Sequence, residues 1–390
     1  MCRFALSLFA FLAAAAMTTI APAEDAKAPA RLRVYIGTAT GKTPMGNESK
    51  GIYASELDLA SGKLSVPVLV AECQGPSFLA LHPDGKHLYA VGSMRSAEGK
   101  SVGALSAFVI EDAKTGKLKM LNQASSGGPG PCHLVVDKAG KLVLAANYGG
   151  GSCCAVAIKE DGSLGEETGF AQHRGSSVDP SRQKEPHAHS INVSPDNRFA
   201  FCADLGLDQV LIYKIDGGKL TPNDPPAGKT APGSGPRHFA FHPSGKFAYV
   251  INELGNTVTA FAYNADKGSL SEIQSIGTLP SDFKETSYTA EVVVHPSGKF
   301  LYGSNRGQDS IAVFKVNADS GKLTAAGHQG EEVKWPRNFN VDPTGKYCLV
   351  CNEKGDSILV WAINQETGAL TPTGNKITVG QPMCVKFLGL

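Results

Sequence analysis

A turn-and-strand motif that occurs six times constrains this chain more than any other feature of its sequence. Each copy has Pro, Gly or Asn in a turn, followed by aromatic and β-branched residues that are typical of a β-strand. The copies recur at intervals of 47 to 57 residues and read HPDGKHLYAVG (82–92), DKAGKLVLAAN (137–147), SPDNRFAFCAD (194–204), HPSGKFAYVIN (242–252), HPSGKFLYGSN (295–305) and DPTGKYCLVCN (342–352). A second marker, Gly-x-Leu, lies between them at Gly62, Gly116, Gly162, Gly218, Gly268, Gly321 and Gly368. A period of about 50 residues with several short strands per unit is typical of a β-propeller, whereas a β-helix needs far shorter repeats.

The repeat predicts an all-β fold, a seven-bladed β-propeller closed by N- and C-terminal strands that share one blade. Six turn-strand units stand inside the chain. The segment QPMCVKFLGL (381–390) resembles the first strand of a unit, and RLRVYIGTAT (31–40) resembles the second. Pairing the two ends would leave no open sheet edge. We therefore predict one propeller domain over 31–390, after a short linker at 24–30.

Residues 1–23 are predicted to be a signal peptide. Arg3 precedes an apolar run at 4–20, and Ala21-Pro22-Ala23 offers small residues for cleavage before Glu24. An uncleaved anchor helix is the alternative, but the run is short for a membrane span. We expect export to the periplasm or the medium, with no membrane attachment after cleavage.

Charge and cysteine content narrow the range of partners. The formal net charge is +1 and the lysines form no basic stripe, so nucleic acid is not an expected partner. Eight cysteines follow the predicted signal peptide. Export permits disulfides, but the spacings match no zinc module, so we expect most of these cysteines to be small buried residues. A closed propeller of this kind is expected to be a monomer.

Aligning the units on their turns predicts which side chains surround one mouth of the central channel. The strand before each turn lines the channel, and its start lies beside the end of the antiparallel strand after the turn. The residues at the start of the first strand are Ser77, Cys132, His189, Arg237, Ala290 and Arg337, and those at the end of the second are Ser93, Tyr148, Leu205, Glu253, Arg306 and Glu353. The alignment therefore predicts that arginine, histidine and glutamate side chains gather at this mouth.

This set of side chains suits acid–base chemistry on an anionic ligand. Arginine binds carboxylate or phosphate through a bidentate fork, and histidine titrates near neutral pH. A solvated polar rim with salt bridges inside the ring is the alternative. A metal site at His187 and His189 lacks a third ligand, and neighbouring arginines would repel a cation. An Asn or Asp residue often stands just before the residue at the end of the second strand. These residues are expected to brace turns, although Asn147 and Asn305 can reach a ligand.

Other polar segments are expected to play secondary roles. His82, His242 and His295 begin turns and are interpreted as structural. His133 and His238 each follow the residue at the start of the first strand by one position, and they are expected to point away from the channel. The polar stretch 171–186 is predicted to overhang the mouth as a lid.

Several ordered motifs resemble the seven-bladed lactonase family, which includes bacterial 6-phosphogluconolactonases of propeller type and fungal carboxymuconate-lactonizing enzymes. They are PHAHS (186–190), DLGLDQVLIY (204–213), GPRHFAFHP (235–243), INELGNTV (251–258), GTLP (277–280), LYGSNRGQDSIAVF (301–314) and WPRNF (335–339). The resemblance implies a catalytic site made of His189, Arg237, Glu253 and Arg306, without a metal or organic cofactor. We expect His187, Arg337, Asn147, Tyr148 and Asn305 to help bind the substrate.

The resemblance also implies the reaction. It predicts hydrolysis of a small-molecule sugar lactone, 6-phosphogluconolactone or, given the export signal, an unphosphorylated gluconolactone. His189 and Glu253 would share the acid–base work, and which of them activates water stays open. Two alternatives remain: a muconate-type lactonizing cycloisomerase, and a non-catalytic propeller that binds an anion or a protein partner.

Overall fold

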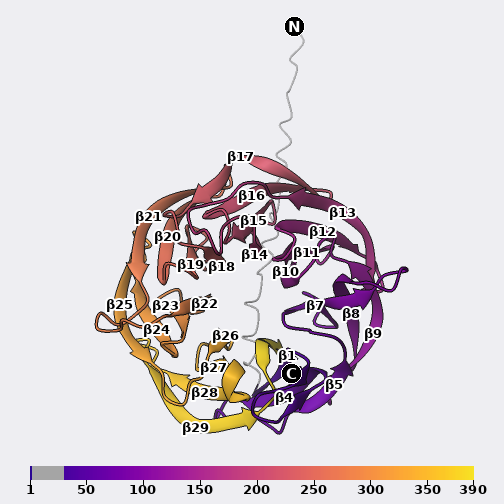
Figure 1. The fold of residues 1–390 in the computed structure, drawn as a ribbon, viewed down its shortest axis with the longest axis vertical. Coiled ribbons are helices and arrows are strands. Elements are labelled where there is room, and N and C mark those ends of the chain that lie inside the picture. The colour runs from indigo at the N-terminus through magenta and orange to yellow at the C-terminus, as the bar shows by residue number, and fades with distance from the viewer. Residues whose placement is uncertain (2–29) are drawn as a thin grey trace.

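The computed structural model describes Met1 and residues 30–390, so the predicted signal peptide after Met1 and all but the last residue of the linker lie outside the described residues. Seven four-stranded sheets stand around a central axis like the blades of a propeller (Figure 1). The predicted all-β, seven-bladed fold is confirmed. Within the described part of the chain, no helix is long and apolar enough to cross a membrane.

Each blade runs outward from the axis in chain order, and the blade closed by the two termini is the one exception. Its order is β30 (Pro382–Gly389), β1 (Arg31–Thr38), β4 (Gly51–Asp58) and β5 (Val68–Glu72), with a small hairpin of β2 (Gly41–Lys42) and β3 (Glu48–Ser49) beside it. The next two blades contain β6 (Leu79–Leu81), β7 (His87–Arg95), β8 (Ser101–Asp112) and β9 (Lys117–Ser125), then β10 (Pro131–Val136), β11 (Leu142–Asn147), β12 (Ser152–Ile158) and β13 (Leu164–Gln172).

The other four blades follow the same plan. They are β14 (Ala188–Val193), β15 (Phe199–Asp204), β16 (Gln209–Asp216) and β17 (Lys219–Lys229); β18 (Pro236–Phe241), β19 (Phe247–Asn252), β20 (Thr257–Asn264) and β21 (Ser269–Gly277); β22 (Tyr288–Val294), β23 (Phe300–Arg306), β24 (Ser310–Val316) and β25 (Leu323–Gln329); and β26 (Pro336–Val341), β27 (Tyr347–Asn352), β28 (Ser357–Ile363) and β29 (Leu370–Thr378). A short 3-10 helix, η1 (Glu353–Gly355), follows β27.

The shared blade closes the ring as the repeat predicts. Strand β30 pairs antiparallel with β1 from Leu32 opposite Gly389 to Thr38 opposite Pro382. The innermost strands then contact one another in sequence around the axis, and β30 lies between β26 and β6. The two ends of the chain thus complete one four-stranded blade between them, and this blade closes the ring between its neighbours.

The repeated turn histidines join neighbouring blades. The Nε2 atom of His82 lies 2.9 Å from the carbonyl oxygen of Gly140, which is in the corresponding turn of the next blade. His242 makes the same contact with Gly298 at 2.9 Å. His295 repeats it with Gly345, again at 2.9 Å. The structural role expected for these three histidines is therefore confirmed.

The Gly-x-Leu marker has a packing role of the same kind. The hydroxyl group of Tyr89 on β7 donates to the carbonyl oxygen of Gly162 in the next blade at 2.8 Å. The phenol of Tyr249 reaches Gly321 in the same way, at 3.0 Å. At Gly162 φ is +80°, and a Cβ atom would lie 2.2 Å from the ring of His87. Only glycine fits there, because the backbone is left-handed and a ring from the preceding blade packs directly against it.

Candidate active site

A β-bulge lies at the start of the inner strand, at the position for which the repeat predicts channel-facing side chains; this position is called the slot below. Opposite β11, the pairing moves from Pro131 to His133 and skips Cys132. The same shift occurs in three other blades, where the skipped residues are His189, Arg237 and Arg337. A bulged residue leaves the ladder and its side chain is re-aimed. The four slot residues therefore turn toward one mouth of the channel, where all of them line the same cavity wall.

The cavity at this mouth has the size of a small-ligand site. It has a volume of 460 Å³ and is lined by Gly130, Cys132, Tyr148, Gly149, Arg182, His189, Glu253, Arg306 and Arg337. A narrower space of 30 Å³ shares Cys132, His189 and Arg337 with it and adds Arg237 and His238. Ligand pockets commonly enclose ~300–1,000 Å³. The two slots predicted from the repeat thus contribute to one pocket.

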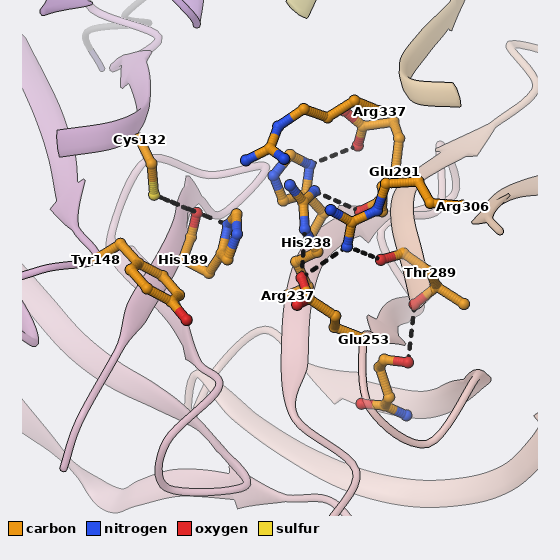
Figure 2. A network of polar contacts seen from close by, with 12 residues as sticks. Cys132, Tyr148, His189, Arg237, His238, Glu253, Thr289, Glu291, Arg306 and Arg337 are labelled. Carbon is orange, nitrogen blue, oxygen red and sulfur yellow. Dashed lines mark hydrogen bonds and ion pairs between the residues drawn. The ribbon is translucent and has the colours of Figure 1, made fainter. Parts of the chain in front are cut away.

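Glu253 forms the centre of an ion-pair network in this pocket (Figure 2). Its Oε2 atom accepts from Nε of Arg237 at 3.0 Å and pairs with Arg306 at 2.9 Å. Its Oε1 atom accepts from Arg182 at 2.8 Å. Burial raises the pKa of this carboxyl, but the attraction of Arg306 and Arg237 outweighs it and lowers the pKa to about 2. Glu253 is therefore ionised at any physiological pH.

Two of the arginines are held from both sides. Arg237 also donates to the carbonyl oxygen of Ala290 at 2.7 Å, and Arg306 donates to that of Thr289 at 2.8 Å. Both carbonyl groups belong to β22 of the blade next to that of Glu253. Burial and neighbouring arginines lower the pKa of Arg237, yet a guanidinium remains charged in a protein. The network thus keeps two buried cations in fixed positions.

His189 lies on the opposite side of the pocket and is neutral. Burial, with Arg237 and His238 nearby, holds its pKa well below the ordinary value. Its ring packs edge-on against Tyr148, with 5.2 Å between ring centroids. The thiol of Cys132 lies 3.8 Å from its Nδ1 atom and 3.3 Å from its carbonyl oxygen. A neutral imidazole has a lone pair that can accept a proton, although burial and the neighbouring arginines make this one a weaker base than a free histidine.

Arg182 is a pocket residue that the repeat did not reveal. It comes from the segment between β13 and β14, for which a lid was predicted, and its guanidinium donates to the Tyr148 hydroxyl at 3.1 Å as well as to Glu253. The segment thus contributes Arg182 to the pocket lining, and its role as a lid stays a prediction. Because Arg182 lies outside the repeated units, aligning the units could not find it.

Arg337 lies at the rim of the pocket with a weaker partner. Its side chain is 30% exposed, and its contact with Glu353 is 3.8 Å long. Arg182 is similarly accessible, at 33%. These two guanidinium groups are the accessible cations of the pocket, whereas Arg237 and Arg306 are buried. An incoming anion would meet them first.

Three of the expected substrate-binding residues do not line the pocket. Asn147 donates to the carbonyl oxygen of Ser126, and Asn305 donates to that of Thr278, so both amides brace turns within the rim. Both side chains are fully buried, and the ligand contact expected for them stays a prediction. His187 stacks on Tyr148, with 4.6 Å between ring centroids, and supports the pocket wall from behind. Tyr148 itself does line the pocket.

The expected orientation of His133 and His238 was wrong. The bulge brings two consecutive residues to the channel side, so these histidines form a layer below His189. The rings of His133 and His238 lie 5.2 Å apart, and His238 is 5.4 Å from the ring of His189. Nδ1 of His238 lies 2.8 Å from the carboxylate of Glu291, a buried acid that the alignment missed because it assigned the slot to Ala290.

The charged groups of the pocket suit an anion better than a cation. They are four arginines and one glutamate, and that glutamate already has three arginine partners. Arginine forks match carboxylate and phosphate oxygens. The pocket thus combines a neutral imidazole, fixed cations and space for a small anionic molecule.

Comparison with known proteins agrees with this combination of fold and site. Residues 33–387 match the protein family described as "Lactonase, 7-bladed beta-propeller". The chain belongs to this lactonase family. The family inferred from the motifs is confirmed, and the match covers nearly all of the described residues.

Similar proteins include a named enzyme and two solved structures. The 6-phosphogluconolactonase of Bacillus subtilis is 39% identical over 354 residues, which are 91% of this chain and 98% of the relative. A candidate 6-phosphogluconolactonase from Bacteroides fragilis has a TM-score of 0.83 at 36% identity, and the match covers 92% of this chain and 98% of that one. The periplasmic gluconolactonase of Pseudomonas aeruginosa has a TM-score of 0.84 at 30% identity, with 92% and 99% covered.

Proposed function

We propose that this protein is a lactonase that hydrolyses 6-phosphogluconolactone to 6-phosphogluconate, with an unphosphorylated gluconolactone as the second candidate substrate. The observation that carries the proposal is the pocket in which a neutral His189 faces arginines fixed by Glu253. Of the relatives that match nearly the whole chain, one is named a 6-phosphogluconolactonase and another a periplasmic gluconolactonase. The reaction is that of a carboxylic-ester hydrolase.

In the proposed mechanism His189 activates water. Its imidazole accepts a proton as the water oxygen bonds to the lactone carbonyl carbon, and the carbonyl oxygen becomes an oxyanion. Arg306 and Arg237 lie where they can stabilise that charge. When the ring C–O bond breaks, the imidazolium returns its proton to the leaving alkoxide, and the new carboxylic acid loses its proton to water.

Glu253 is the weaker candidate for the base. Its carboxylate has ion pairs with three arginines and a pKa of about 2, so it has little affinity for a proton at neutral pH. Its proposed role is to hold Arg237 and Arg306 in place. This resolves, as a proposal, the choice between His189 and Glu253 that the sequence leaves open.

Arg182 and Arg337 are proposed to bind the anionic end of the substrate. They are the partly exposed cations at the rim, and only one of them has a close carboxylate partner. A phosphate group would gain two charge-assisted contacts there. The excess of arginine over glutamate favours the phosphorylated lactone over the neutral one.

Two other functions remain as alternatives to be separated by experiment. A lactonizing cycloisomerase of the muconate type would use the same base and arginines to close a ring instead of opening it. A non-catalytic propeller would bind an anion or a partner at the same mouth without turnover. Either would leave the arginine network unchanged.

The test uses the chain from Glu24 onward. Acid release from glucono-1,5-lactone and from its 6-phosphate is followed above the spontaneous rate, with and without a chelator. Turnover that a chelator does not affect, with higher kcat/KM for the phosphate ester, is the expected result. If the protein binds these lactones or a muconate but turns over none of them, the result would favour the non-catalytic binding propeller.

Export is proposed on separate grounds. The N-terminal apolar run and its cleavage site are typical of a signal peptide, and one relative is a periplasmic gluconolactonase. An exported enzyme would meet lactones outside the cytosol, and we expect a soluble monomer there. Fractionation of cells that produce the full chain, with N-terminal sequencing for a start at Glu24, tests this.

A further inference from the structure

A second cluster of reactive side chains lies buried between two blades, away from the pocket wall. Cys153 on β12, Cys202 on β15 and His173, which directly follows β13, belong to it. Their ligand atoms all lie within 4.8 Å of one another. Both cysteines are fully buried, and the side chain of His173 is 0% exposed. The proposed lactonase mechanism uses none of them.

The ring of His173 is fixed with one nitrogen free. Its Nδ1 atom lies 2.6 Å from Oδ2 of Asp204, which sets the tautomer with the proton on that side. The other nitrogen, Nε2, is buried and has no hydrogen-bond partner. Metal-binding histidines characteristically place their second nitrogen on a carboxylate in this manner, which orients the ring and makes it a better ligand.

The rest of the surroundings hold this arrangement in place. The other oxygen of Asp204 accepts from the backbone N–H groups of His187 and Gly206 at 2.8 and 2.9 Å. Tyr213 stacks on the ring of His173 with 6.1 Å between centroids. The carboxylate is therefore fully engaged, and the imidazole cannot turn its free nitrogen toward solvent.

We propose that Cys153, Cys202 and His173 bind one thiophilic d10 metal ion, Zn²⁺ or Cu⁺. Two thiolates and an imidazole are the donors that such ions prefer over the oxygen ligands of magnesium or calcium. Zn²⁺ would balance the charge of two thiolates, whereas Cu⁺ suits a site with three protein donors. Binding releases the thiol protons to solvent, so the affinity rises with pH.

The bound ion would act as a clamp rather than as a catalyst. It would join β12 and β13 of one blade to β15 of the next. Through Asp204 it would also stabilise the backbone at His187, which packs behind Tyr148 of the pocket. A ligand that binds only the folded state raises its stability in proportion to the logarithm of ligand concentration over Kd.

The experiment uses the mature chain, reduced and stripped of metal under anaerobic conditions. Zn²⁺ and Cu⁺ are added separately, the protein is desalted, and bound metal and melting temperature are measured. One ion per chain and a raised melting temperature are expected with at least one of the two, which also identifies the ion. Cys153→Ser and Cys202→Ser should lose the ion, while Cys348→Ser, which alters an equally buried cysteine elsewhere, should keep it.

A spectroscopic probe keeps the test decisive even if the serine variants fold poorly. Co²⁺ added to the wild-type chain should give a thiolate-to-metal absorption band with the intensity of two sulfur ligands. The proposal is overturned if the wild type retains neither ion, if Cys153→Ser binds as well as the wild type, or if peptide mapping finds a Cys153–Cys202 disulfide that persists after reduction.

Discussion

The charge of Glu253 should stabilise the folded protein in a pH-dependent way. The substitution Glu253→Gln keeps the shape of the side chain but leaves Arg237 and Arg306 buried without their shared counter-ion. A carboxyl pKa of about 2, against the ordinary 4.5, corresponds to a stabilisation of about 3 kcal/mol for the ionised carboxylate. Removing one partner of a buried ion pair typically costs ~3–5 kcal/mol, which agrees with this magnitude.

The direction of the pH dependence follows from the lowered pKa. Because the folded state holds the carboxylate ionised, the stabilisation is complete above the ordinary pKa of 4.5 and is lost as the pH falls through about 2. Protonated Glu253 then resembles glutamine. The destabilisation caused by Glu253→Gln should therefore be about 3 kcal/mol at pH 7 and should approach zero near pH 2.

Urea unfolding at a series of pH values, followed by circular dichroism, measures this difference. Glu353→Gln is the matched control, since its 3.8 Å contact with Arg337 at the rim should contribute at most ~1 kcal/mol. A loss that is equally large at pH 7 and near pH 2 would mean that shape, not charge, holds the network. No loss at pH 7 would refute the account of Glu253 as the centre of the network.

Three further predictions concern the site and the fold. His189→Ala should lower kcat for lactone hydrolysis by ~10² to 10⁴ while the far-UV circular dichroism stays unchanged, and full turnover would exclude it as the base. Arg182→Ala should raise KM for the 6-phosphate lactone more than for gluconolactone, measured side by side; an equal change for both would argue against a phosphate contact. Gly162→Ala should destabilise the fold by at least ~1 kcal/mol more than Gly217→Ala, because both positions have positive φ but only Gly162 packs against His87. Thermal melting of both variants would measure this, and equal melting temperatures would contradict the packing role.

The position of the pocket was predictable because each residue's place in the repeat indicates its place in a blade. His189, Arg237 and Arg337 share one place in the unit, and so do Glu253 and Arg306. Equivalent places in successive blades lie on the same rim, so their convergence follows from the symmetry of a propeller. No long-range contact had to be known to predict it.

The residues that were missed or misplaced lie where the chain departs from the repeat. Arg182 belongs to an irregular segment between two blades, and no periodicity predicts where its guanidinium lies. His238 was misplaced and Glu291 was missed because a bulge interrupts the inner strand and changes the alternation of faces after it. The expected bracing role of Asn147 and Asn305 is observed, while their contact with a ligand stays a prediction.

The sequence by itself determined the number of blades and the closure by both ends, because strand, turn and Gly-x-Leu positions are local and repeated. Its ordered motifs indicated the family. Only the tertiary structure decided the state of each group in the site. The pKa directions of Glu253 and His189 depend on burial and on charges from other blades. The gathering of Cys153, His173 and Cys202 depends likewise on how two blades pack. Electrostatic and coordination chemistry act through distance in space, and distance between blades is what a linear pattern does not contain.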